Sequence, residues 1–136
     1  PQFASLDMTF LYTNFSATSL SFFYNKIERI RQTDLTGFTR LTFLHLGFNR
    51  ISHIDDGSSL QMLTRLTRLT IHQNQLSRIP LTIRNMSTLT FLSFEDNLIT
   101  ELHCLDFTNL PSLTELNLKS NRISKLELVK CSDYFK

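Results

Sequence analysis

The stretch LTFLHLGFNRISHI, residues 41–54, alternates apolar and polar side chains and then turns at an asparagine. Apolar residues stand at its positions 1, 4, 6, 11 and 14, and Asn49 stands at position 9. The alternation around Leu44 and Leu46 predicts a short strand that buries one side, because successive side chains of a strand point to opposite faces. One such strand cannot bury its apolar side alone, so this stretch needs neighbours of the same kind.

Four further stretches fit the same template and start 23 to 25 residues apart along the chain. They are ATSLSFFYNKIERI (17–30), LTRLTIHQNQLSRI (66–79), LTFLSFEDNLITEL (89–102) and LTELNLKSNRISKL (113–126). Stacked turns of this kind cover one another's apolar sides, and their strands form a parallel sheet with a spacing of about 4.8 Å. The repeat therefore predicts a solenoid with strands near residues 19–22, 43–46, 68–71, 91–94 and 115–118.

An asparagine stands at position 9 of every stretch, where the chain leaves the strand and its backbone groups lose their ladder partners. These residues are Asn25, Asn49, Asn74, Asn97 and Asn121. A buried amide offers one acceptor and two donors, so it can satisfy backbone groups of its own turn and of a neighbouring one. We expect the five asparagines to form a ladder of hydrogen bonds along the solenoid.

Apolar pairs spaced three residues apart mark the returning half of each turn and predict short helical or 3-10 segments that pack on the core. The pairs are Leu35/Phe38, Leu60/Leu63, Ile83/Met86, Phe107/Leu110 and Cys131/Tyr134. Residues 1–16 do not fit the template, and the alternation around Leu6, Met8 and Phe10 predicts a capping strand. The chain thus divides into a cap at 1–16 and five repeats at 17–40, 41–65, 66–88, 89–112 and 113–136. Because the last repeat carries no polar cap, we expect a longer array.

These repeats resemble the leucine-rich repeats of vertebrate Toll-like receptor ectodomains, most closely in LDFTNLPSLTELNLKSNRISKL, residues 105–126. The resemblance implies an α/β solenoid with a curved parallel sheet on its concave face and short helical, 3-10 or irregular segments on its convex face. It also implies the extracellular or endosomal-lumenal part of a type I membrane receptor of innate immunity. Such a pattern-recognition receptor binds a microbial nucleic acid, lipid or protein, dimerises, and signals through domains that lie elsewhere. One departure is that the family's N-terminal cap usually carries a cysteine pair, and residues 1–16 carry no cysteine.

Two other classes of protein share such repeats. One is the structural or adhesive extracellular protein, such as a matrix proteoglycan core or a neuronal adhesion receptor. The other is the cytosolic scaffold, whose repeats of about 22 residues fit the observed spacing less well. The sequence on either side of this chain would discriminate among the three classes.

The open face of the predicted sheet carries template positions 3, 5, 7 and 8, which we expect to face solvent. Its ligand-binding candidates are Phe23, Tyr24, Phe43, His45, Phe48, Arg68, His72 and Phe91. Exposed aromatic rings beside charged donors are typical of recognition surfaces. In the plainer interpretation, Phe43 and Phe91 only stack on neighbouring turns. Protonation of His45 and His72 near Arg68 would also make this face cationic in acid and suit a phosphate-bearing ligand.

The remaining features point to surface modification rather than to chemistry. Asn14 and Asn85 begin Asn-x-Ser sequons and are predicted glycosylation sites. Cys104 and Cys131 are either a disulfide between turns or two buried thiols, and we favour the thiols because Cys131 takes an inward-facing position. No phosphate loop, HExxH or nucleophile motif is present, and the pairs Asp55–Asp56 and Glu95–Asp96 are interpreted as solvated charges. The sequence therefore predicts no enzyme, no cofactor and no metal site.

Overall fold

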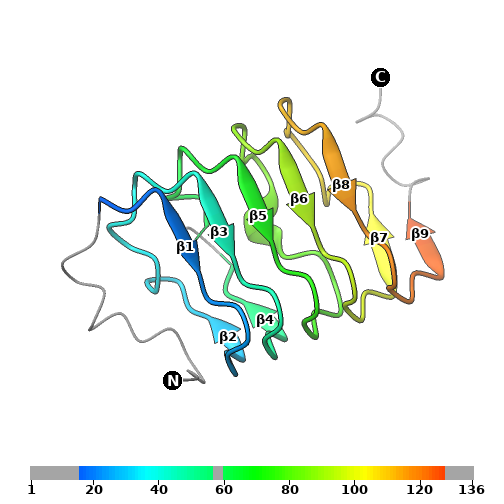
Figure 1. Ribbon diagram of the computed structural model, residues 1–136. Coiled ribbons are helices and arrows are strands. Elements are labelled where there is room, and N and C mark those ends of the chain that lie inside the picture. Colours follow the sequence, from blue (N-terminus) through cyan, green and yellow to red (C-terminus); the bar gives the residue numbers. More distant parts are fainter. Residues whose placement is uncertain (1–15, 57–59, 128–136) are drawn as a thin grey trace.

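The computed structural model describes residues 16–56 and 60–127 of the 136-residue chain. One sheet contains five parallel strands in chain order (Figure 1). These strands are β1 (Ser19–Ser21), β3 (Phe43–His45), β5 (Arg68–Thr70), β6 (Phe91–Ser93) and β8 (Glu115–Asn117). The predicted solenoid and its parallel sheet are thereby confirmed. The predicted capping strand around Leu6, Met8 and Phe10, and the last apolar pair, lie outside the described residues.

The strands pair in the register that the template predicts. Leu44 stands opposite Leu20 on one side and Leu69 on the other, so equivalent apolar residues of successive turns lie next to each other. Leu44 and Leu69 are both 0% exposed, whereas the equivalent Leu116 in the last strand is 39% exposed. Leu116, in the edge strand β8, is therefore less covered than Leu44 and Leu69, which have a paired strand on both sides.

The asparagines make the hydrogen bonds that the ladder requires. The Asn74 amide nitrogen donates to the carbonyls of Leu46 (2.9 Å), Ile71 (3.2 Å) and His72 (3.0 Å), and its oxygen accepts from the Ile51 amide (2.9 Å). The same four contacts recur at Asn49, Asn97 and Asn121. Asn25 donates to two carbonyls of its own turn. Each asparagine after the first thus joins its own turn to the preceding one.

A second ladder, which our sequence analysis missed, runs along the start of the strands. Threonine stands at template position 2 in every turn. The hydroxyls of Thr42, Thr67, Thr90 and Thr114 each donate to the carbonyl of the equivalent threonine one turn back, at 3.1 Å. The repeated threonine was visible in the sequence, but its backbone acceptor is defined only by the register.

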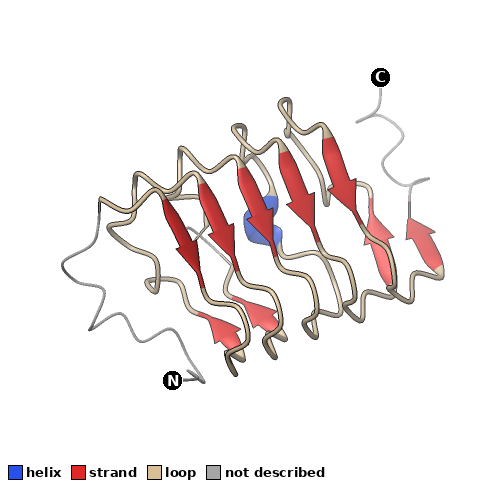
Figure 2. Cartoon of the chain, viewed as in Figure 1, coloured by secondary structure: helices blue, strands red, loops and turns tan. Residues whose placement is uncertain are grey.

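The returning halves are mostly irregular (Figure 2). The apolar pairs pack on the core as predicted, and single turns closed by bonds such as Phe38 N–H to Leu35 O (3.2 Å) carry them. Within the described residues only one segment is helical, the 3-10 helix η2 (Leu81–Ile83). Pro80 precedes it with φ of −63°, which pre-sets the chain for a helical turn. The expectation of helical segments is correct for the third repeat alone, and the others take the irregular form.

Short strands at template positions 13 to 15 form two further pairs that the sequence analysis did not predict. They are β2 (Arg29–Ile30) with β4 (His53–Ile54), and β7 (Glu101–His103) with β9 (Lys125–Glu127). The pairing between these short strands is interrupted at the third repeat, which has no such strand. There Pro80 takes the place of Asp55, whose N–H donates to the Ile30 carbonyl at 2.9 Å. Proline has no N–H, so this backbone hydrogen bonding between short strands stops at the third turn. A hollow of about 150 Å³ lies there, between the second and third turns.

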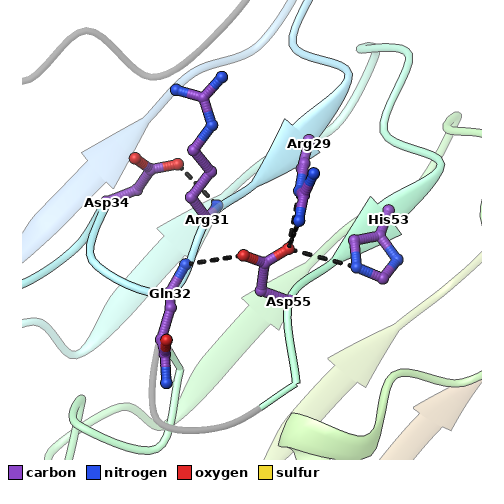
Figure 3. A network of polar contacts seen from close by, with 6 residues as sticks. All are labelled: Arg29, Arg31, Gln32, Asp34, His53 and Asp55. Atoms are coloured by element: carbon purple, nitrogen blue, oxygen red, sulfur yellow. Dashed lines mark hydrogen bonds and ion pairs between the residues drawn. The ribbon is translucent and has the colours of Figure 1, made fainter.

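The Asp55 carboxylate ties the first turn to the second (Figure 3). It accepts from the Arg29 side chain at 2.7 Å and from the backbone N–H of Gln32 at 3.3 Å, and it lies 3.2 Å from His53 Nε2. The hydrogen bond from Arg29 is the main reason why the pKa of Asp55 is lowered. Asp55 was interpreted as a solvated surface charge, and the structure adds that it pairs with Arg29, because β2 and β4 bring these residues together.

Candidate binding face

All eight residues predicted to bind a ligand belong to one connected group. Arg68 contacts Phe43 and Phe91, Phe43 stacks on His45, and His45 contacts Phe23. Phe23 in turn contacts the remaining three members of the group, Tyr24, Phe48 and His72. We call these eight residues the aromatic face. The parallel register creates it, because residues 23 to 25 positions apart in the sequence become neighbours on the sheet.

Arg68 lies between two phenyl rings. Its Cζ is 4.4 Å from the Phe91 ring centroid and 5.0 Å from that of Phe43, since the register places these residues opposite Arg68 on either side. The two phenylalanines therefore stack on Arg68 rather than on each other. Such cation–π contacts hold a guanidinium in place while its N–H groups stay available. In the part of the chain that the structure describes, no carboxylate pairs with Arg68.

Gly47 makes room for the rings on the other side of the face. A Cβ atom at this position would lie 2.5 Å from His72 Cε1 and 2.9 Å from Phe23 Cε1. Any side chain at position 47 would therefore push these rings away from each other. The sequence analysis missed this role. The only sign of this role in the sequence is that Gly47 stands at template position 7, where the other turns carry Phe23, His72 and larger charged residues.

Position 8 of every turn adopts a left-handed backbone. The φ angles are 60° at Tyr24, 57° at Phe48, 55° at Gln73, 57° at Asp96 and 58° at Ser120. The turn that follows each strand requires this conformation, and it aligns the first two of these side chains. The rings of Tyr24 and Phe48 stack with centroids 4.4 Å apart and planes 18° apart.

The expectation that positions 3, 5, 7 and 8 all face solvent is wrong in part. Thr70 and Ser93, both at position 5, are buried, and the phenyl rings are half-buried because they pack on Arg68 or on other rings of the face. Among the rings of the aromatic face, Tyr24 is the most exposed, at 63%. The aromatic face is thus a packed layer with an exposed rim rather than a set of free side chains.

The last two turns change the character of the open face. Glu95 accepts from Asn117 Nδ2 at 3.3 Å, and Asp96 accepts from Gln73 Nε2 at 2.8 Å. These acids are therefore engaged in contacts between turns as well as with solvent. The side chains of the open face are aromatic and basic over the first three turns, and two acids join them in the fourth. The charge of the face therefore changes along the solenoid.

The surroundings of His45 oppose its protonation. Burial lowers the pKa of His45 from its ordinary value of 6.5, and the positive charges of Arg68 and His72 lower it further. The Thr70 hydroxyl lies 3.4 Å from His45 Nδ1. This finding weakens the hypothesis that the face becomes cationic at endosomal pH, because the lowered pKa of His45 opposes its protonation.

We therefore expect the NMR titration midpoint of His45 to lie below 6.5 and to rise in the Arg68→Ala variant. The folded protein keeps His45 neutral where the unfolded chain takes up a proton. Its contribution to stability is thus present above the unfolded pKa and is lost as the pH falls through the folded pKa. Arg65→Ala, outside the aromatic face, is the control and should leave the midpoint unchanged. A wild-type midpoint at or above 6.5 would contradict the packing described here.

The two predicted modification features have different outcomes. Asn85 is exposed on the returning half of its turn with φ of 68°, and its Oδ1 accepts from Asn109 Nδ2 at 3.3 Å. Asn14 lies outside the described residues. Cys104 is 9% exposed and is disulfide-bonded, so the favoured interpretation of free buried thiols is wrong. Residue spacing could not decide this, because a buried position suits a half-cystine as well as a thiol.

Over residues 16–56 and 60–127, no helix is long and apolar enough to cross a membrane. In the same ranges, no three or more histidine, cysteine or acidic side chains are grouped as metal ligands.

Comparison with known proteins identifies the family. The sequence profile described as "Leucine rich repeat" matches residues 39–99 and 64–123. Osteomodulin of Bos taurus is 32% identical over 108 residues, which cover 76% of this chain and 24% of osteomodulin. Nephrocan of Mus musculus is 34% identical over 103 residues (76% and 20%), and opticin of Canis lupus familiaris is 39% identical over 72 residues (53% and 19%). The chain spans less than a quarter of the length of each of these relatives. It belongs to the leucine-rich-repeat family.

Proposed function

We propose that this chain is the partner-binding part of an extracellular leucine-rich-repeat protein of the structural or adhesive kind. The observation that carries the proposal is the aromatic face, in which eight residues from four turns form one connected surface around Arg68. The similarity to osteomodulin, nephrocan and opticin supports this class of extracellular protein. The disulfide at Cys104 supports an oxidising compartment, since cytosolic proteins keep their thiols reduced.

The chemistry of the face favours a protein as the partner. Aromatic residues and arginine are enriched at the centres of protein interfaces, where they contribute most of the binding energy. The rings here already pack on each other, so binding costs little additional side-chain entropy. The acids Glu95 and Asp96 border the face on one side, so the partner's basic residues would lie over the fourth turn.

A Toll-like receptor ectodomain is the second candidate. The core packing of apolar pairs such as Leu35 and Phe38 favours it, because these pairs and the repeat spacing carry the resemblance. In that case the aromatic face would bind a microbial nucleic acid, lipid or protein. The parent would be a dimerising membrane receptor with signalling domains outside this chain. None of the three relatives named above is a Toll-like receptor, which places this candidate second.

We expect the chain, secreted from cultured cells, to bind a decellularised extracellular matrix and to lose about tenfold in affinity in the Arg68→Ala variant. Truncating an arginine at the centre of an interface costs roughly 1.4 kcal/mol or more, which corresponds to that factor. Arg65→Ala removes the same charge from an exposed position outside the aromatic face and should bind like the wild type.

The matrix is then treated with protease or with nuclease before binding is measured. Loss of binding after protease treatment alone fits the proposal. Equal binding of the Arg68→Ala and Arg65→Ala variants, or binding that survives protease, would argue against it. Binding of a microbial lipid or an oligonucleotide that requires Arg68 would instead favour the second candidate.

A further inference from the structure

A hollow of about 360 Å³ lies beside the aromatic face, where the chain leaves β1 and β3. Template positions 8, 9 and 10 of the first two turns line it, together with position 8 of the third. Its residues are Tyr24, Asn25, Lys26, Phe48, Asn49, Arg50 and Gln73. The hollow is shallow and open to solvent, so it suits a ligand that lies on the surface. The interface proposed above does not use Lys26 or Arg50.

One wall of the hollow is a flat aromatic surface. Tyr24 and Phe48 stack nearly parallel, 4.4 Å apart, and Tyr24 is 63% exposed. Both residues have a left-handed backbone, with φ of 60° at Tyr24 and 57° at Phe48. An exposed aromatic ring with a polar hydroxyl suits a ligand that is apolar on one face and carries polar groups around its edge. A sugar ring has this character, with C–H groups on its faces and hydroxyls around it.

The polar contacts of the hollow come from two cations. Lys26 and Arg50 are exposed, and within the described residues neither forms an ion pair. The amides of Asn25 and Asn49 donate to backbone carbonyls of the ladder, so they shape the wall instead of offering donors to a ligand. Gln73, which lines the hollow in the third turn, donates to Asp96 at 2.8 Å. The hollow is therefore positive at Lys26 and Arg50.

The run of adjacent basic residues along this edge is short. At template position 10 the first two turns carry Lys26 and Arg50, but the third and fourth carry Gln75 and Leu98. A nucleic acid requires a basic stripe that follows its phosphates over several contacts. Two cations beside one aromatic platform instead match one or two anionic units of a ligand.

We infer that this hollow binds an anionic saccharide, with a sugar ring packed on Tyr24 and its sulfate or carboxylate groups on Lys26 and Arg50. The inference goes beyond the proposed function, since it assigns a second ligand to a surface that shares only Tyr24 and Phe48 with the aromatic face. Sulfated and uronate-bearing sugars share the chemistry that these residues recognise, and the experiment separates them.

The test is calorimetric titration of the full chain with three probes. These are a heparin-derived tetrasaccharide, a hyaluronan tetrasaccharide that carries carboxylates but no sulfate, and inorganic tripolyphosphate. The Lys26→Ala/Arg50→Ala variant should bind the preferred saccharide at least about tenfold more weakly, because it loses two charge-assisted contacts. The Arg40→Ala/Arg65→Ala variant, which loses the same charge at exposed positions just before the strands, should stay within about twofold of the wild type.

A third variant tests the aromatic platform. Tyr24→Asn removes the ring but keeps a residue that tolerates left-handed backbone. It should weaken saccharide binding by about fivefold without changing the binding of tripolyphosphate. Binding of either tetrasaccharide with these variant effects supports the site, and the better probe identifies the anionic group. No binding of either one, equal losses in the two double variants, or an unchanged affinity in Tyr24→Asn would overturn it.

Discussion

Replacing Asn74 by leucine is expected to lower the free energy of unfolding by roughly 2–4 kcal/mol. Asn74 is 6% exposed and makes four hydrogen bonds to the backbone, two of them to the preceding turn. Leucine has a similar size but no polar atoms. The Ile51 amide would therefore stay buried without its partner, which is costly, and the Leu46 carbonyl would keep only the bond from Asn49. Urea unfolding followed by circular dichroism measures the difference.

Gln75→Leu is the matched control for this substitution. Gln75 is exposed one position beyond Asn74, and we expect a change under about 0.5 kcal/mol. Gln73 is less suitable, because its φ of 55° makes any replacement sensitive to backbone strain. Equal urea midpoints for Asn74→Leu and Gln75→Leu would show that the ladder does not stabilise the fold.

Replacing Leu69 by alanine is the second large effect that we expect, at about 2–5 kcal/mol. Leu69 is 0% exposed in β5, with Leu44 and Leu92 paired on either side. Removing its side chain loses buried apolar contacts and leaves a cavity that rigid neighbouring turns cannot fill. Thermal and urea unfolding both report this loss.

The sequence itself offers the control, because Leu116 occupies the same template position in the last strand. It is 39% exposed, so Leu116→Ala should cost about 1 kcal/mol or less. Two identical substitutions at equivalent positions should thus differ severalfold. Similar costs at Leu69 and Leu116 would mean that stacking between turns does not determine burial in this solenoid.

The five main strands could be predicted because their signal is local and repeated. Leu44, Leu46 and Asn49 define a strand followed by a turn, and four other stretches repeat the pattern in register. The membership of the aromatic face follows from the same register. The contacts within it could not be predicted, since the place of Arg68 between Phe43 and Phe91 depends on side-chain conformations.

Features that depend on backbone geometry could not be predicted from the sequence repeat. The left-handed residues at position 8 include Tyr24 and Phe48, types that do not indicate this conformation. The strands β2, β4, β7 and β9 lie in short segments whose pairing follows from stacking rather than from alternation. Pro80 was the exception. Its lack of an N–H predicts a break in any such ladder once the ladder is known to exist.

The asparagine ladder also has a direction, and this bears on how the molecule is made. Asn49 accepts from the Ile27 amide and donates to the Phe22 carbonyl, both in the turn before its own, and Asn74 does the same for Ile51 and Leu46. Each turn is therefore completed by the turn that follows it. During synthesis, a newly emerged turn keeps unsatisfied polar groups until one more repeat has left the ribosome. A chain cut short therefore leaves unsatisfied polar groups in the turn before the cut, in addition to lacking the turns beyond it.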